Sequence, residues 1–144
     1  MEEEAVADAS VVVKWFLEEG YSEQARKLRD CFVTGKISLS VPSLLFYEVL
    51  NALWDSGQFR AEELALAARS LHKYGLKTWE PKGEVIERTA AMAQGKDVSV
   101  YDAAYVALAV HIDAKLYTAD AELVRKFPDT ARHIREYDAD SGSR

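Results

Sequence analysis

The chain has 144 residues, close to the commonest size of a protein domain, so we expect one compact unit that folds without disulfides or structural metals. Hydrophobic residues make up 49% and charged residues 29% of the chain, which excludes the disordered and fibrous classes. The formal net charge is -6, so the molecule as a whole repels nucleic acid, and binding one would need metal cations or a local basic rim.

Cys31 is the only cysteine, which excludes an internal disulfide and suits a reducing compartment. The first residues are acidic where a secretory signal would be basic, and no apolar run approaches the roughly 20 residues that span a bilayer. We therefore expect a cytoplasmic protein that makes no contact with membranes.

Short apolar runs alternate with longer helical patterns, and proline, glycine or capping residues mark many of their ends. This alternation predicts an α/β fold in which a central, mainly parallel sheet carries helices on its faces. We expect a single domain over residues 1–138 and a flexible C-terminal tail at residues 139–144. In chain order, the patterns predict a strand at 6–7, helices at 10–17 and 22–33, a strand at 39–41, helices at 43–55 and 61–74, a strand at 76–79, helices at 84–94 and 100–112, a strand at 116–118, a helix at 121–127 and a last strand at 134–137.

Three aspartates lie where a predicted strand or loop leads into a helix, and each has a simple structural explanation. Asp8 follows the first strand and can cap the next helix, and Asp120 can complement the dipole of the helix that it precedes. Ser99 and Asp102 match the spacing of a capping box. None of the three indicates chemistry when taken alone.

Glu48 is harder to explain by structure alone. It is the only acidic residue between Ser43 and Trp54, in a predicted helix that is otherwise mostly apolar. A carboxylate is seldom placed on such a helix without a partner, although the stripe that carries it can also face solvent.

The positions of the four acids together predict a metal site. Open parallel sheets bind ligands in the crevice at the carboxyl ends of their strands, where three of the acids are expected. If the helix that carries Glu48 packs over this crevice, four carboxylates converge and need a cation to ionise together. Oxygen ligands favour Mg²⁺, with Mn²⁺ as the alternative, and the histidines are too scattered for zinc. We therefore predict a phosphodiester hydrolase whose catalytic residues and metal ligands are Asp8, Glu48, Asp102 and Asp120.

Four separated motifs carry a resemblance to a known family. They are residues 8–15 (DASVVVKW), Pro42 with residues 47–53 (YEVLNAL), residues 101–105 (YDAAY) and residues 118–120 (TAD). Together, in this order and at this chain length, they resemble the PIN domains of VapC toxins, and the resemblance covers nearly the whole chain.

The resemblance implies a three-layer α/β/α fold and an endoribonuclease that cleaves RNA with Mg²⁺ or Mn²⁺. It also implies a homodimer and inhibition by a cognate VapB-like antitoxin. In such proteins the residues that match Asp8, Glu48 and Asp102 ligate or organise the metal, and the residue that matches Asp120 completes the acidic site, often less directly.

Other residues in the motifs fit supporting roles. Ser10, Asn51 and Thr118 fit positions from which they would orient the carboxylates. Lys14 is expected either to contact phosphate or to be solvated.

Two other functions stay open on the residues alone. A PIN fold can serve as a non-catalytic interaction module, although the intact set of four acids argues against this. A receiver-like phosphoacceptor signalling domain also combines a small parallel α/β fold with clustered aspartates around Mg²⁺. That alternative expects a phosphorylatable aspartate after a middle strand, whereas the middle motif here is Glu48 within a helix.

Overall fold

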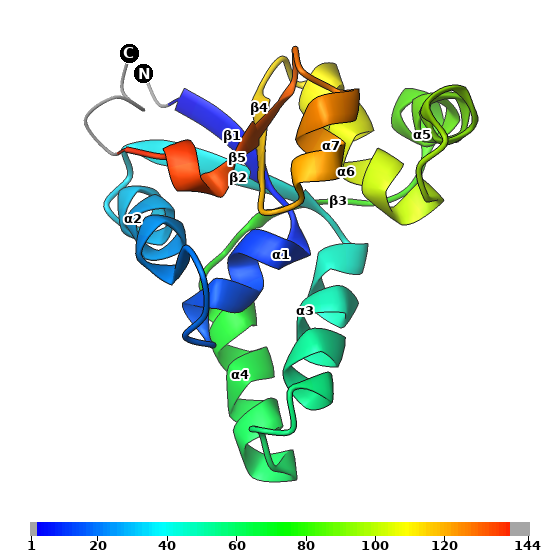
Figure 1. Cartoon of the computed structure of the whole chain (residues 1–144). Helices are drawn as coiled ribbons and strands as arrows, with labels where there is room; N and C mark the ends of the chain where they lie inside the picture. Colours follow the sequence, from blue (N-terminus) through cyan, green and yellow to red (C-terminus); the bar gives the residue numbers. More distant parts are fainter. Residues whose placement is uncertain (1–2, 139–144) are drawn as a thin grey trace.

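A central parallel sheet organises the protein, of which a computed structural model describes residues 3–138. The strand order in this part of the chain is β3-β2-β1-β4-β5, and every pairing is parallel (Figure 1). The prediction of a mainly parallel sheet is confirmed, and the tail predicted at residues 139–144 lies outside the described residues. The strands are β1 (Glu3–Ala7), β2 (Ile37–Pro42), β3 (Lys77–Trp79), β4 (Lys115–Thr118) and β5 (Ala131–His133).

Helices follow most of the strands, as the alternating pattern predicts. None of the helices in residues 3–138 combines the length and the apolar character that crossing a membrane requires. The α-helices are α1 (Ala9–Val12), α2 (Ser22–Val33), α3 (Leu44–Asp55), α4 (Ala61–Lys73), α5 (Gly83–Lys96), α6 (Val100–His111) and α7 (Ala121–Lys126), and the 3₁₀-helices are η1 (Val13–Trp15) and η2 (Ile134–Glu136).

The helices form layers on both sides of the sheet. Helix α6 lies against β1, β2 and β4, and α5 packs along α6. Helix α2 lies against β2, on the side of the sheet opposite to α5 and α6 (Figure 1). Helices α3 and α4 contact each other and project together as an arm. The predicted three-layer α/β/α arrangement is confirmed.

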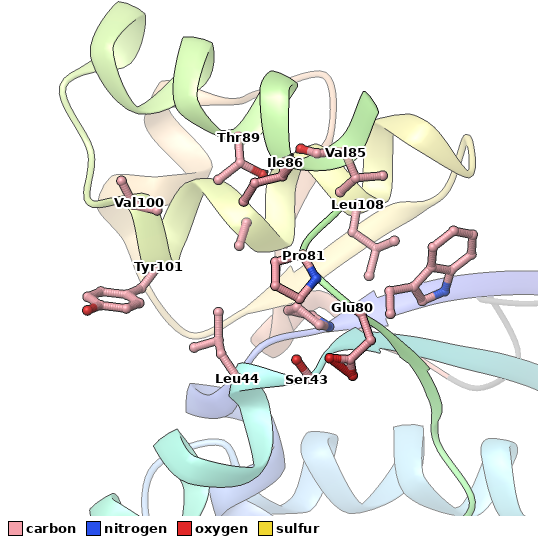
Figure 2. Close-up of a pocket in the computed structure, with 13 residues that line it drawn as sticks. Ser43, Leu44, Glu80, Pro81, Val85, Ile86, Thr89, Val100, Tyr101 and Leu108 are labelled. Atoms are coloured by element: carbon pink, nitrogen blue, oxygen red, sulfur yellow. Dashed lines mark hydrogen bonds between the residues drawn. The ribbon is translucent and has the colours of Figure 1, made fainter. Parts of the chain in front are cut away.

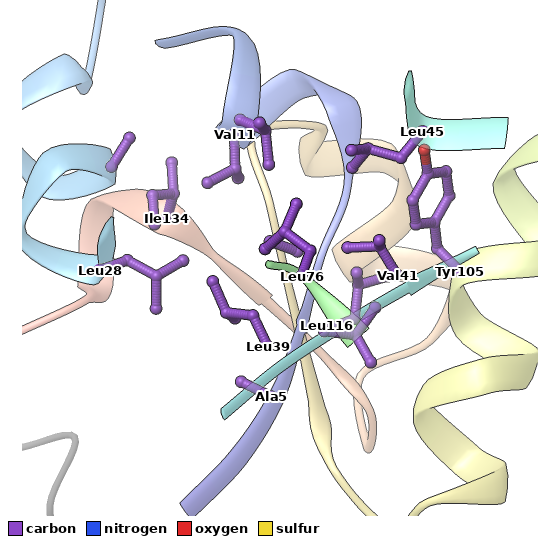
Figure 3. Packing of buried hydrophobic residues seen from close by; sticks show 14 of the residues in the cluster. Ala5, Val11, Leu28, Leu39, Val41, Leu45, Leu76, Tyr105, Leu116 and Ile134 are labelled. Carbon is purple, nitrogen blue, oxygen red and sulfur yellow. The ribbon is translucent and has the colours of Figure 1, made fainter. Parts of the chain in front are cut away.

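The hydrophobic core lies between these layers. Three successive residues of β1, Ala5, Val6 and Ala7, are buried, because a strand inside a parallel sheet is covered on both faces. Figure 3 shows side chains of the strands meeting side chains of the helices, among them Leu28, Leu39, Val41, Leu45 and Leu116. The core therefore fixes the carboxyl ends of β1 and β4 against the helices that follow them.

The prediction of a last strand at residues 134–137 is wrong. Strand β5 comes earlier and is aligned by β4, with Ala131 opposite Leu116 and His133 opposite Thr118. The extended backbone ends at His133 because its Nδ1 accepts a hydrogen bond from the amide of Arg135, which turns the chain into η2.

The first elements also differ in length from the prediction. Strand β1 begins at Glu3, which pairs with Ile37 of β2. The helix expected at residues 10–17 is a single turn, α1, that tightens into η1. This short connection places Asp8 directly at the edge of the sheet.

Candidate acidic site

The strand order reverses between β1, the central strand of the sheet, and β4, which lies beside it. In open parallel sheets, ligands bind in the crevice beyond the carboxyl ends of the strands at such a reversal. Asp8 comes directly after β1, and Asp120 comes two residues after β4. Two of the four predicted acids therefore flank the position where this fold class binds ligands.

The same strand order excludes the phosphoacceptor alternative. Receiver domains have the order 2-1-3-4-5, in which the first strand lies between the second and the third. Here β1 lies between β2 and β4, and β3 is at the edge of the sheet. The middle acid, Glu48, lies inside α3 and not at the end of a strand.

Asp8 is held by hydroxyl groups that also hold the loop after β4. The Ser10 hydroxyl donates a hydrogen bond to Asp8 Oδ1 at 2.5 Å and accepts one from the amide of Ala119 at 2.9 Å. Thr118 Oγ1 lies 3.5 Å from Ser10 Oγ and accepts a hydrogen bond from the amide of Asp120 at 3.1 Å. These bonds connect the residue after β1 to the loop that carries Asp120.

Asp8 is only 7% exposed, and this burial has the largest effect on its pKa. The pKa of Asp8 is raised overall from 3.8 to about 6. Hydrogen bonds from Ser10, Thr118 and the amide of Val11 lower the pKa, and the negative charge of Asp102 is a second cause that raises it. An ionised Asp8 at neutral pH is therefore a poorly solvated charge that a cation would stabilise.

Glu48 reaches the site from α3 and is only partly exposed. The hydroxyl of Tyr105 donates a hydrogen bond to Glu48 Oε1 at 2.6 Å. Burial raises the pKa of Glu48, the hydrogen bond from Tyr105 lowers it, and the charge of Asp102 raises it. The helix of Glu48 thus faces the helix of Asp102, and the glutamate has a partner, as its apolar surroundings require.

The other two acids lie at the starts of α6 and α7. Ser99 caps α6, with its Oγ accepting a hydrogen bond from the amide of Asp102 at 3.0 Å. Burial raises the pKa of Asp102, the charge of Asp120 raises it further, and the hydroxyl of Ser99 lowers it. Asp120 caps α7 by accepting a hydrogen bond from the amide of Glu122 at 2.9 Å. Asp102 and Asp120 therefore both take part in helix capping, and this role is compatible with a second role in the candidate acidic site.

The four carboxylates influence one another, with Asp102 at the centre. Its charge raises the pKa of Asp8 and of Glu48, and the charge of Asp120 raises the pKa of Asp102. No ion pair within residues 3–138 includes any of the four. The fold therefore gathers four acids from distant parts of the chain without a basic side chain to neutralise them.

The donors suit a hydrated cation better than an ion enclosed by protein. Within the described range, no group of three or more His, Cys, Asp or Glu side chains is arranged to hold a metal ion by itself. Mg²⁺ normally keeps several waters and takes one or two carboxylates from a protein. Structural zinc instead takes four ligands, with sulfur or imidazole nitrogen among them. A set of oxygen donors with uncompensated negative charge therefore fits Mg²⁺ or Mn²⁺.

The supporting residues predicted from the sequence divide into two groups. Ser10 and Thr118 act on the carboxylate of Asp8 as predicted. Asn51 is exposed on α3 and makes no hydrogen bond through its side chain to any residue in the described range. It therefore does not orient a carboxylate in this structure.

Lys14 is neither solvated nor free for phosphate. It is 7% exposed, and its ammonium group pairs with Glu19 at 3.0 Å. Burial of its side chain and the pairing of its ammonium group with Glu19 indicate a structural ion pair.

Tyr105 is the functional candidate that the sequence reasoning missed. It belongs to the YDAAY motif, three residues after Asp102, but no role was derived for it. Its position in a nearly all-apolar helix could have indicated a role, because the hydroxyl of a buried tyrosine needs a hydrogen-bond partner.

A separate apolar pocket of about 200 Å³ opens next to the helices that carry Glu48 and Asp102. Figure 2 shows Leu44 and Tyr101 on one side of it, with Pro81, Ile86 and other apolar side chains around it. None of the four acids lines this pocket. It is a neighbouring feature and not the acidic site itself.

Comparisons with known proteins agree with this geometry. The family model of the PIN domain matches residues 5–128. Ribonuclease VapC3 from Pyrobaculum aerophilum is 38% identical over 128 residues, which cover 85% of this chain and 94% of that protein. The crystal structure of PAE2754 from Pyrobaculum aerophilum is 27% identical, with a TM-score of 0.66, over 94% of this chain and 92% of that one.

A more distant structure shares the fold. VapBC-1 from nontypeable Haemophilus influenzae matches with a TM-score of 0.66 at 13% identity, over 92% of this chain and 99% of that one. The match of the family model over most of the chain and the 38% identity to a VapC ribonuclease are decisive. This chain belongs to the PIN-domain family.

Proposed function

We propose that this protein is an Mg²⁺- or Mn²⁺-dependent endoribonuclease that hydrolyses RNA phosphodiester bonds, and that it is the toxin of a VapBC-type toxin–antitoxin pair. The observation that carries the proposal is the group of four acids, Asp8, Glu48, Asp102 and Asp120, without a basic partner at the reversal of the sheet. The similarity to a protein named a ribonuclease supports RNA as the substrate class.

The acids would hold the cation through oxygen atoms. Asp8 is the most constrained of them, because Ser10 and burial both fix its carboxylate. The charge of Asp102 acts on both Asp8 and Glu48, so a cation beside it would stabilise the ionised forms of all three carboxylates. When bound, a divalent cation stabilises negative charge on the phosphate and helps to generate the nucleophile from water.

The protein residues provide position and charge for this reaction. Ser10 keeps Asp8 in register with the loop after β4, and Tyr105 keeps Glu48 facing Asp102. Because the net charge of the chain is -6, the attraction of RNA phosphates to this site depends on the cation. Removal of the metal is therefore expected to weaken both RNA binding and cleavage.

We propose two protein partners, a cognate VapB-like antitoxin and a second copy of the chain. The antitoxin is supported by the similarity of the fold to a toxin–antitoxin complex from Klebsiella pneumoniae and to VapBC-1 from nontypeable Haemophilus influenzae. Large apolar side chains are exposed on the arm, at Tyr47, Trp54 and Leu66, which is the kind of surface that protein partners cover. Light scattering of the purified chain, alone and after co-expression with a small upstream gene product, tests both partners.

Cleavage of a panel of structured and single-stranded RNAs tests the activity. Wild-type protein and Asp8→Asn are compared in EDTA, Mg²⁺ and Mn²⁺, with folding of both checked by circular dichroism. Metal-dependent cleavage that Asp8→Asn loses supports the proposal. Absence of cleavage by the wild-type protein on every RNA and with either metal contradicts it and favours a non-catalytic interaction module.

A further inference from the structure

Tyr105 occupies an unusual position for a residue with a polar group. It lies one helical turn after Asp102 on α6 and is 2% exposed. Its ring belongs to the hydrophobic core together with Val41 and Leu45 (Figure 3). A phenol buried so deeply needs a hydrogen-bond partner, and the partner is Glu48 Oε1 at 2.6 Å.

The bond from Tyr105 is the only hydrogen bond that the Glu48 side chain makes within residues 3–138. It joins α3 to α6 across 57 positions of the chain. A glutamate side chain has several rotatable bonds, so a single anchor on one oxygen removes most of its freedom. Ordering of Glu48 in the folded protein thus depends on one hydroxyl group.

The phenol can act only as a donor in this contact. The hydroxyl of Tyr105 donates to Glu48 Oε1, and the carboxylate accepts. A phenol with its ordinary pKa of about 10 carries its proton at neutral pH, and an ionised carboxylate can only accept. A hydrogen bond to a charged acceptor is among the stronger ones in proteins.

We propose that Tyr105 is a positioning residue that acts through Glu48. Its hydroxyl donates to Oε1 of Glu48. No residue in the described range donates a hydrogen bond to Oε2 of Glu48, so this oxygen is available to the cation or its waters. The inference rests on the proposed metal-dependent function and assigns to Tyr105 the task of keeping Glu48 available to the metal. Outer partners of metal ligands typically affect metal affinity or activity by about 10- to 100-fold.

The variant Tyr105→Phe removes the hydroxyl and keeps the ring that fills the core. We expect the half-saturating Mn²⁺ concentration to rise about 10-fold or more and kcat to fall by a similar factor. The KM for RNA, measured at saturating Mn²⁺, is expected to stay within about twofold of wild type because no substrate contact is removed. The dependence of the melting temperature on Mn²⁺ without RNA gives a second measure of affinity that does not depend on activity.

Tyr137→Phe is the matched control. Tyr137 is also buried, at 6% exposed, and its hydroxyl is hydrogen-bonded to Cys31, away from the acids. The variant loses the same atom from a similar environment, so its Mn²⁺ dependence is expected to match that of wild type. A similar loss of affinity in both variants would point to general loosening of the core and overturn the inference.

A double-mutant cycle tests whether Tyr105 acts through Glu48. In a Glu48→Gln background, addition of Tyr105→Phe should change the cleavage rate by less than about twofold, because the group to be positioned is already lost. Equal losses from Tyr105→Phe in both backgrounds would overturn the inference.

A further pair of variants leaves Tyr105 intact, in case Tyr105→Phe does not fold. Glu48→Gln keeps an acceptor for the phenol, whereas Glu48→Met leaves it unpaired and is expected to be less stable. Equal stability of Glu48→Gln and Glu48→Met would show that the hydroxyl of Tyr105 does not depend on residue 48 for its hydrogen bond, and would overturn the inference. If wild type cuts RNA while Tyr105→Phe binds Mn²⁺ normally, only the inference on Tyr105 fails; if wild type cuts no RNA, the proposed function fails.

Discussion

The hydroxyl of Ser10 lies 2.5 Å from Asp8 Oδ1 and donates a hydrogen bond to it. The same oxygen accepts a hydrogen bond from the amide of Ala119 in the loop after β4. One small side chain therefore links the ends of β1 and β4, the neighbouring strands between which the strand order reverses. This link fixes both the orientation of Asp8 and the approach of the loop that carries Asp120.

Ser10→Ala is expected to weaken the site and the fold together. The variant leaves the buried carboxylate of Asp8 and the amide of Ala119 without this partner. We expect a loss of stability of about 1 to 3 kcal/mol and a drop of about 10- to 100-fold in Mn²⁺ affinity or in activity. Urea denaturation and Mn²⁺ titration of the variant measure the two effects.

Ser40→Ala is the control for this prediction. Ser40 is fully buried in β2, and its hydroxyl has no hydrogen-bond partner among residues 3–138. Removal of an unpaired buried hydroxyl is expected to leave stability unchanged or to raise it. Equal destabilisation by the two variants would show that the Ser10 hydroxyl has no special role.

The stability of the metal-free protein is expected to depend on the protonation of Asp8. Because burial raises the pKa of Asp8 from 3.8 to about 6, the folded protein binds this proton more tightly than the unfolded chain. The contribution of Asp8 to stability is therefore fully present below about pH 4 and is lost as the pH rises through about 6. At neutral pH the ionised group lowers the free energy of unfolding by up to about 3 kcal/mol.

Asp8→Asn tests this dependence because its side chain cannot ionise. In EDTA, the stability of the variant relative to wild type should increase between about pH 4 and about pH 7 and then level off. Denaturation curves over this range give the difference directly. A difference that stays constant with pH would contradict the assignment of the titration to Asp8.

Divalent cations are expected to stabilise the folded protein. Burial, and to a smaller extent the charges of neighbouring acids, raise the pKa of Asp8, Glu48 and Asp102, and a bound cation would offset both costs of ionisation. At a concentration about 100 times the Kd, the gain is about 2.7 kcal/mol, which for a domain of this size raises Tm by several degrees, roughly 8 °C. The shift should be larger at about pH 8 than at about pH 5, because protonated carboxylates do not bind metal.

The variants for this prediction separate site binding from a general salt effect. The rise in Tm should be largely absent in Asp8→Asn and should not be reproduced by NaCl at equal ionic strength. A rise of the same size in Asp8→Asn would place the stabilising ion elsewhere on the protein.

Asp120 allows its structural and its chemical roles to be distinguished. It caps α7 through a hydrogen bond from the amide of Glu122. Asparagine caps helices about as well as aspartate, whereas alanine loses about 1 kcal/mol. Asp120→Asn should therefore keep the stability of the protein but lose activity, and Asp120→Ala should lose both. Full activity of Asp120→Asn would remove Asp120 from the acidic site.

The sequence predicted the fold where apolar runs define the elements. Strand β2, which includes Leu39 and Val41, is almost wholly buried, so its sequence carries the signal by itself. Strand β5 was misplaced because its residues, Ala131 to His133, form no apolar run and are aligned only by pairing with β4. A strand that forms only because it pairs with a neighbouring strand cannot be predicted from its own residues.

The acids of the candidate site could be proposed from the sequence because three of them lie where a strand or loop leads into a helix and Glu48 lies in a mostly apolar helix. The contact between Tyr105 and Glu48 could not, because its two groups are 57 positions apart and meet only when α3 and α6 pack. The pairing of Lys14 with Glu19 was missed for the opposite reason, since a lysine near a motif suggests a ligand contact although a local carboxylate is available. In both pairs the partner is determined by which groups are buried together in the fold, and not by their spacing in the sequence.

Location of the bound cation by Mn²⁺ anomalous scattering is the most direct test of the metal site. Crystals of wild type and Asp8→Asn would be grown without metal and soaked in MnCl₂. We predict an anomalous peak within coordination distance of the carboxylate of Asp8 in wild type, about 2.0 to 2.2 Å, and no peak there in Asp8→Asn. A wild-type protein that cleaves RNA with Mn²⁺ but shows no peak beside Asp8, Glu48, Asp102 or Asp120 would contradict the assignment of these acids as the metal site.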